Sequence, residues 1–205
     1  MRKTVVVTEN DAMYDELIEK ATKALAPENI RVIARSEKNA KKGFHSIRKC
    51  GIKFYVAGSV SDGEDSCSVY KKDWTDDELE IAIENTARDV IVTCFSDLLM
   101  ERNGDNLENW KPNMNEPFFI LTNKSRVNGA GVLLCDDVLR EVFRKVGPYF
   151  ILPSSIHEVL VFPETDRTKG RELSAMVKQI NGDVVADEDV LSDEAFFYDG
   201  NNWTA

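Results

Sequence analysis

The sequence is poor in histidine and lacks the short motifs that mark common catalytic and nucleotide-binding sites. Its only two histidines are His45 and His157, so a histidine-based metal site would need carboxylates from elsewhere in the chain. Neither a GxGxxG nor a GxxxxGK[ST] phosphate loop occurs. These absences favour a protein without enzyme activity, and we predict no cofactor, no metal site and no catalytic residue.

Long apolar runs and paired cysteines are also missing. No stretch approaches the roughly 18 to 20 apolar residues of a membrane helix, and the first residues, MRKTVVVTEN, lack the apolar region of a secretory signal. The four cysteines form no CxxC pair, which argues against a disulfide framework and a zinc ribbon. We therefore expect a cytoplasmic protein with reduced thiols and no contact with membranes.

Charge is plentiful but unevenly distributed. The net charge of the 205 residues is -10, yet residues 31–53 carry eight basic side chains and one acidic one, Glu37. The remainder of the chain therefore carries about -17. The basic segment could simply offset acidic neighbours or protect an edge strand, or it could bind a polyanion such as nucleic acid. Its candidate polyanion-binding residues are Lys41, Lys42, Arg48 and Lys49.

Hydrophobic periodicity predicts an α+β protein with an antiparallel or mixed sheet on which amphipathic helices pack. Helices are expected over residues 10–26, 135–146 and 169–180, and an antiparallel meander over residues 30–60. Thr75, followed three residues later by Glu78, is typical of a capping box, and a long helix is expected from Thr75 to Met100. The β-branched residues near 90–95 could instead form a strand. Strands are expected at 118–123, 129–134, 149–152 and 159–162, with a short final strand near 195–198.

The length fits one domain, and we expect a single compact body over residues 1–205. Two subdomains, 1–104 and 117–205, are the alternative, because a polar loop of unusual length joins them. Acidic clusters at 62–65, 73–84 and 187–194 match no calcium-loop spacing and are predicted to be solvated surface.

The segment YFILPSSIHEVLVFP, residues 149–163, is the candidate small-ligand or hydrolase site because it combines Ser154, Ser155, His157 and Glu158. An extended strand here would place His157 and Glu158 on opposite faces, with the Cα atoms of Ser155 and His157 about 6.5 Å apart. Neither serine lies in a GxSxG or SxxK pattern. The alternative is a structural turn in which the serine hydroxyls bond to local backbone groups.

Residues 117–162 resemble a family of uncharacterised bacterial proteins, found mainly among Clostridia-type Firmicutes and classed as a domain of unknown function. The resemblance rests on Leu121-Thr122-Asn123-Lys124, Asn128-Gly129-Ala130 and the segment from Leu152 to Glu158, with a similar ending in VLSDEAFFYDG. More distantly, the order of elements is similar to that of the YtpQ-like proteins. Neither resemblance implies an established activity.

Three hypotheses follow from these observations. The first is a protein-interaction or regulatory domain with an unknown protein partner. The second is a small-ligand or hydrolase site in which the serines, His157 and Glu158 are joined by Asn123, Lys124 and Asn128. The third is polyanion binding by the basic segment. The oligomeric state is left open.

Overall fold

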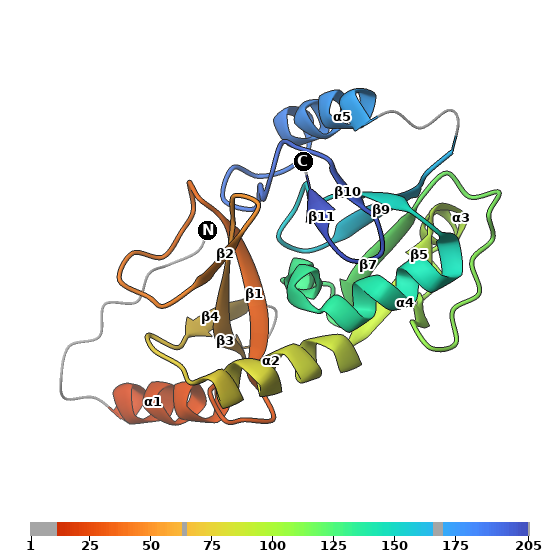
Figure 1. Cartoon of the computed structure of the whole chain (residues 1–205). Coiled ribbons are helices and arrows are strands. Elements are labelled where there is room, and N and C mark those ends of the chain that lie inside the picture. The colour runs from red at the N-terminus through yellow and green to blue at the C-terminus, as the bar shows by residue number, and fades with distance from the viewer. Residues whose placement is uncertain (1–11, 63–64, 166–169, 205) are drawn as a thin grey trace.

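The computed structural model describes residues 12–62, 65–165 and 170–204 of the chain. Its strands form two antiparallel sheets, one with four strands and one with seven, and helices pack on both (Figure 1). This architecture confirms the predicted α+β class. The N-terminal residues 1–10 and the expected helix starts at 10 and 169 lie outside the described residues.

The four-stranded sheet is built around one long strand, β3 (Ile52–Asp62). On one side it pairs with β1 (Arg31–Ser36), and on the other with β2 (Ile47–Lys49) and β4 (Asp65–Tyr70). Cys50 and Gly51 both have positive φ angles, of 49° and 74°, which is the geometry of a tight two-residue hairpin between β2 and β3. The helix α1 (Ala12–Ala24) packs on β3.

The predicted long helix over residues 75–100 is wrong, because it is three elements. α2 (Asp76–Arg88) is followed directly by β5 (Val90–Cys94) and then by the one-turn helix α3 (Phe95–Leu99). The β-branched residues of β5 favour a strand, and β7 (Phe119–Asn123) supplies an antiparallel partner along the whole of β5. The strand alternative for residues 90–95 is therefore the correct one.

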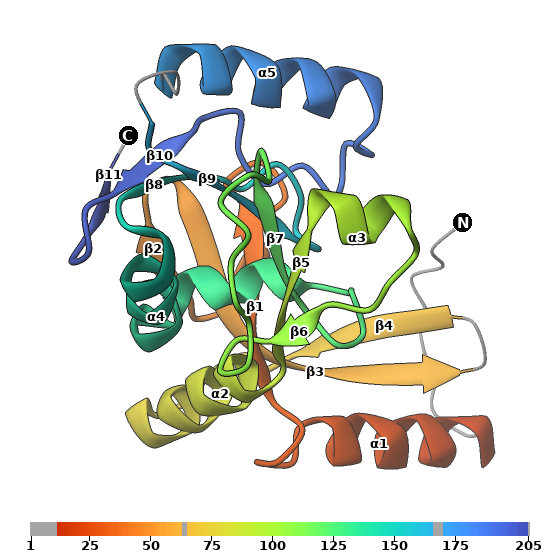
Figure 2. The ribbon, with the colours of Figure 1, turned by 90° about the vertical axis from the view of Figure 1, so that its right-hand side faces the viewer.

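The seven-stranded sheet has the order β11-β10-β8-β9-β7-β5-β6. Its remaining strands agree with the predicted strands at 149–152, 159–162 and 195–198, and two short strands are added at its edges. The bounds are β6 (Asp105–Asn106), β8 (Tyr149–Leu152), β9 (Val159–Pro163), β10 (Phe196–Tyr198) and β11 (Trp203–Thr204). The helix α5 (Gly170–Asp183) packs against β8, on the outer side of this sheet (Figure 2).

The predicted strand at 129–134 is also wrong, because these residues form a 3-10 helix, η1 (Gly129–Leu134). The backbone N–H groups of Gly129 and Ala130 donate to the carbonyls of His157 and Ile156, not to a neighbouring strand. η1 leads into the predicted amphipathic helix, here α4 (Asp136–Val146). It packs against both β1 and β7, so this short helix lies between the two sheets.

One hydrophobic cluster includes side chains from both sheets and from η1 and α4. Val32 and Phe54 belong to the first sheet, Leu121 and Val161 to the second, and Leu139 to α4. All five are at most 1% exposed. Residues on both sides of the predicted subdomain boundary therefore share a core.

Candidate functional site

The segment between β8 and β9 is a bend, and β9 begins only at Val159, close to the expected strand at 159–162. Ser155 forms an isolated bridge with Val190, and the carbonyl of Ser154 accepts from the backbone of Leu191. Both serines are buried, whereas Glu158 is exposed. The bend is thus held against the segment that precedes β10.

His157 uses both of its ring nitrogens inside the protein. Its Nδ1 accepts the backbone N–H of Asn128 at 3.2 Å, and its Nε2 lies 3.4 Å from Oδ2 of Asp189. A neutral imidazole has one lone pair, and this lone pair is occupied by the Asn128 N–H. The imidazole consequently presents no free basic nitrogen to a substrate.

The serine next to this histidine bonds to backbone. The Ser155 hydroxyl accepts the His157 backbone N–H at 3.0 Å, which is the local turn bond typical of serine. A nucleophilic serine would instead donate its hydroxyl proton to the imidazole, and the structure shows no such hydrogen bond. The arrangement is that of a structural turn.

Asn123 closes the loop that connects β7 to η1. Its Oδ1 accepts from the Val127 backbone N–H and from the Ser125 hydroxyl, and its Nδ2 donates to the Val127 carbonyl at 2.8 Å. Arg126 and Asn128 have φ angles of 54° and 56°, which side-chain-bearing residues adopt uncommonly. The asparagine therefore fixes the loop, while Lys124 and Ser125 are exposed at its tip.

Asn128 connects this loop to the four-stranded sheet. Its Oδ1 accepts from the guanidinium of Arg35 at 3.1 Å, and its Nδ2 donates to the Ser68 hydroxyl at 3.1 Å. Together with His157, these contacts join β1, β4 and the β8–β9 bend. Sequence reasoning named Asn128 and His157 as candidate ligand residues. It missed Arg35, Ser68 and Asp189, because their contacts depend on the tertiary fold.

A cleft of about 420 Å³ lies between β1 and the Asn123–Asn128 loop. Arg31, Asp89, Lys124 and Ser125 contribute polar groups to its lining, and Val32, Ile33, Ala57 and Val127 contribute apolar ones. Of the predicted ligand residues, Asn123, Lys124 and Asn128 line this cleft. Ser154, Ser155, His157 and Glu158 do not.

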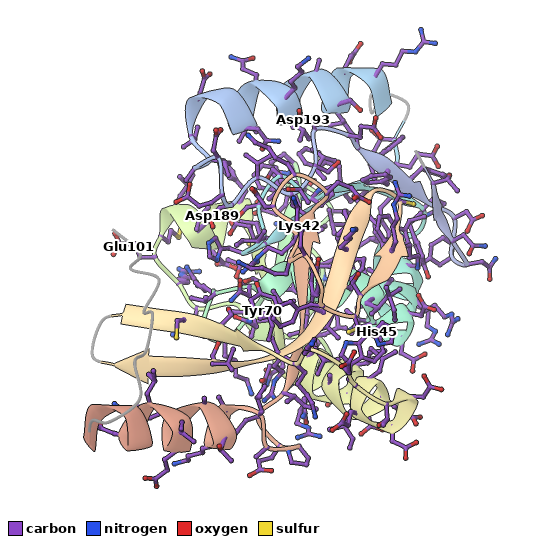
Figure 3. The ribbon with its side chains drawn as sticks, turned by 90° about the vertical axis from the view of Figure 1, so that its left-hand side faces the viewer. Lys42, His45, Tyr70, Glu101, Asp189 and Asp193 are labelled. Carbon is purple, nitrogen blue, oxygen red and sulfur yellow. The ribbon has the colours of Figure 1, made fainter. Side chains whose placement is uncertain are left out.

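The basic segment is mostly paired with carboxylates. Arg48 and Lys53 contact Glu37, and Lys49 contacts Asp136 at 3.4 Å. Lys38 lies 3.4 Å from Asp187, and the Lys41 ammonium lies 5.4 Å from the centre of the Tyr70 ring. Figure 3 shows the face on which the loop carrying Lys42 meets the segment carrying Asp189. Lys38 and Lys49 therefore offset acidic groups of the second half of the chain, whereas Arg48 and Lys53 are paired within the segment itself.

Within residues 12–62, 65–165 and 170–204, no group of three or more histidine, cysteine, aspartate or glutamate side chains is arranged to hold a metal ion. The same residues contain no helix that is both long and apolar enough to span a membrane. All four cysteines are free, and burial raises the pKa of the Cys135 thiol to about 12. Cys135 is therefore an unreactive core residue.

A second surface lies on α3 and the residue that follows it. Leu98, Leu99 and Met100 are 43%, 69% and 61% exposed. The Phe95 ring lies 5.2 Å from that of Phe118, which in turn lies 5.1 Å from Phe162. We call Phe95, Leu98, Leu99 and Met100 the α3 surface. Sequence periodicity missed it because Phe95 and Leu98 fitted the apolar stripe of one long helix.

A model of a family of unknown function, DUF5688, matches residues 69–200. The chain belongs to this family. The DUF5688 match includes the α3 surface, the Asn123–Asn128 loop, His157 and Asp189, whereas Arg31 and Arg35 precede it. No curated protein and no solved structure matches the chain. The match confirms a family of unknown function; the Firmicutes origin and the relation to YtpQ-like proteins stay predictions.

Proposed function

We propose that this DUF5688 member is a non-catalytic interaction domain that binds another protein through the α3 surface. The observation that carries the proposal is the exposure of three consecutive large apolar residues, Leu98, Leu99 and Met100. Exposed apolar side chains that lie together are typical of protein interaction sites. The engaged nitrogens of His157 support a role that is not catalytic.

Charge around the α3 surface favours a basic partner. The carboxylates of Asp97, Glu101 and Glu116 lie on α3 or beside it, against the single guanidinium of Arg102. Figure 3 shows Glu101 at the edge of the molecule. A second copy of the chain would place like charges opposite one another in a symmetric interface. An amphipathic helix with apolar residues on one face and lysines beside them is the complementary partner.

The basic segment supports a polyanion-binding function less well. Arg48 and Lys49 form ion pairs within the protein, with Glu37 and Asp136. A polyanion would compete with these carboxylates for the two cations. The pairing therefore supports the structural interpretation of this segment.

The proposal is tested with a synthetic helical peptide that has leucines at positions i, i+3, i+4 and i+7 and lysines elsewhere. We expect its addition to shift the backbone amide resonances of residues 95–100 in a two-dimensional NMR spectrum. The double substitution Leu99→Ser and Met100→Ser should weaken binding at least about tenfold, because exposed anchors carry most of an interface's free energy.

Val184→Ser is the matched control, because Val184 is 80% exposed at the end of α5, away from α3. It should leave the peptide affinity unchanged. A peptide of the same composition with its leucines scrambled should bind weakly. Equal binding of both peptides, or equal losses in the two protein variants, would show that the α3 surface is not the binding site.

A further inference from the structure

We propose that the cleft between β1 and the Asn123–Asn128 loop binds a small molecule carrying a carboxylate or phosphate group. The cleft volume of about 420 Å³ falls in the range of roughly 300–1,000 Å³ that small-molecule sites occupy. This site is separate from the α3 surface. The proposal therefore stands or fails independently of the proposed protein interaction.

The ligand class follows from the charges of the lining. Arg31, Lys124 and Asp89 are its charged residues, so the cleft carries one net positive charge. Arg31 and Asp89 neutralise each other, with Nε and Nη2 of Arg31 both 2.9 Å from Oδ2 of Asp89. The exposed Lys124 ammonium is then the unbalanced charge. An anionic group is the ligand chemistry that complements it.

The cleft wall is fixed before any ligand arrives. The Arg31 guanidinium is held by Asp89 and also donates to the carbonyls of Glu28 and Ile30, each at 2.9 Å. The Lys124 backbone N–H donates to the Asp89 carbonyl at 3.1 Å, which places the loop against the end of α2. Little conformational entropy would be lost at these groups on binding, which favours affinity.

The lining also offers an apolar contact for the uncharged part of the ligand. Val127, which is half-buried on the loop side, is the apolar side chain of the lining that a ligand can reach, and Val32 and Ala57, at most 1% exposed, close the floor beneath it. Ser59 and Ser125 add exposed hydroxyl-bearing residues at the rim. An apolar floor with a few polar groups is the usual composition of a small-molecule site.

The test uses the full chain at low ionic strength, where screening of Lys124 is smallest. Inorganic phosphate, citrate and neutral glucose are added separately while the backbone amide resonances are recorded. We expect phosphate or citrate, but not glucose, to shift the amides of residues 123–128 in a saturable way. The anion that binds more tightly identifies the group.

Lys124→Ala should weaken this binding about tenfold, because a charge-assisted hydrogen bond is lost, and Lys124→Arg should largely retain it. Lys111→Ala is the matched control, since Lys111 is also exposed but lies outside the cleft. Three results would each overturn the proposal: no saturable shift with either anion, equal shifts with glucose, or equal effects of the Lys124→Ala and Lys111→Ala substitutions.

Discussion

Gly131 lies where η1 packs directly against the backbone of β1. A Cβ atom built on Gly131 would lie 1.9 Å from the carbonyl oxygen of Val32, far inside van der Waals contact. The neighbouring atom belongs to the backbone, so it cannot move aside by a change of rotamer. Gly131 is thus required by the close packing of η1 on β1.

Gly131→Ala should lower the free energy of unfolding by about 2 to 3 kcal/mol, because η1 must move away from β1. Gly182→Ala is the control, since a Cβ on this α5 residue meets nothing within 4 Å. It should raise the free energy of unfolding by up to about 1 kcal/mol, as alanine is the better helix former. Urea denaturation of the three proteins measures both effects, and an unchanged midpoint for Gly131→Ala would contradict the packing argument.

At the residue scale, the structure divides the side chains of the predicted ligand site. The Asn128 backbone contacts His157, but His157 does not line the cleft that Asn123 and Asn128 line. Their hydrogen bonds could not be foreseen, because Asp189 reaches His157 from an acidic stretch 32 residues further along the chain that was predicted to be solvated. Local pattern contains no information about such a contact.

At the scale of elements, α2 shows how a short pattern determines where a helix begins. The Thr75 side chain accepts the Glu78 backbone N–H, and the Glu78 carboxylate accepts the Thr75 backbone N–H. The same carboxylate also accepts from the Lys71 ammonium. These hydrogen bonds, the one from Lys71 foremost, lower the pKa of Glu78 below its ordinary value.

The lowered pKa has a consequence for stability. Glu78 binds a proton more readily in the unfolded chain than in the folded one. The stabilisation that its ionised carboxylate gives the folded protein is therefore fully present above the ordinary carboxyl pKa of about 4.5, and it is lost as the pH falls through the pKa of the folded state. Glu78→Gln should therefore lower the free energy of unfolding by about 0.5 kcal/mol at pH 7 and by less at pH 3.5.

Urea denaturation at the two pH values measures this difference. Glu80→Gln is the control, because Glu80 is an exposed residue of the same helix outside the capping box. A loss from Glu78→Gln that is equal at pH 7 and pH 3.5 would show that the carboxylate charge does not stabilise α2.

The amino-acid sequence predicted the elements whose signals are local. It failed where a distant segment of the same chain determines the structure. The capping box and the stripe of α4 were sufficient for helices at these positions. Residues 90–94 fit a helical stripe as well as a strand, and β7 decided the outcome by pairing with them. The apolar end of residues 129–134 suggested a strand, yet the backbone N–H groups of Gly129 and Ala130 bond to the β8–β9 bend instead of to a strand, and η1 forms.

At the scale of the whole molecule, the two sheets share one core, and we propose that residues 1–205 form a single cooperative domain. Val32 and Phe54 from the first sheet belong to the same buried cluster as Leu121 and Val161 from the second. Separating the sheets would expose these side chains to water. At about 1.5–3 kcal/mol for each large apolar side chain, this exposure is too costly for two independent units.

Thermal unfolding should consequently occur in one transition. The calorimetric and van't Hoff enthalpies should agree, and circular dichroism and tryptophan fluorescence should give the same midpoint. A fragment of residues 69–205, which contains the whole DUF5688 match, should lack a cooperative transition because β1 and β3 are missing. Independent folding of that fragment would support the two-subdomain alternative.

The charge pairs of the basic segment also constrain the order in which the protein matures. Lys49 and Asp136 are 87 residues apart, Lys38 and Asp187 are 149 apart, and the Cys50 thiol bonds to a carbonyl 153 residues later. A ribosome releases the N-terminal residues first. Lys49 and Lys38 must therefore leave the exit tunnel before Asp136 and Asp187 have been translated, whereas Glu37 emerges together with its partners Arg48 and Lys53. The two long-range pairs can form only late in synthesis.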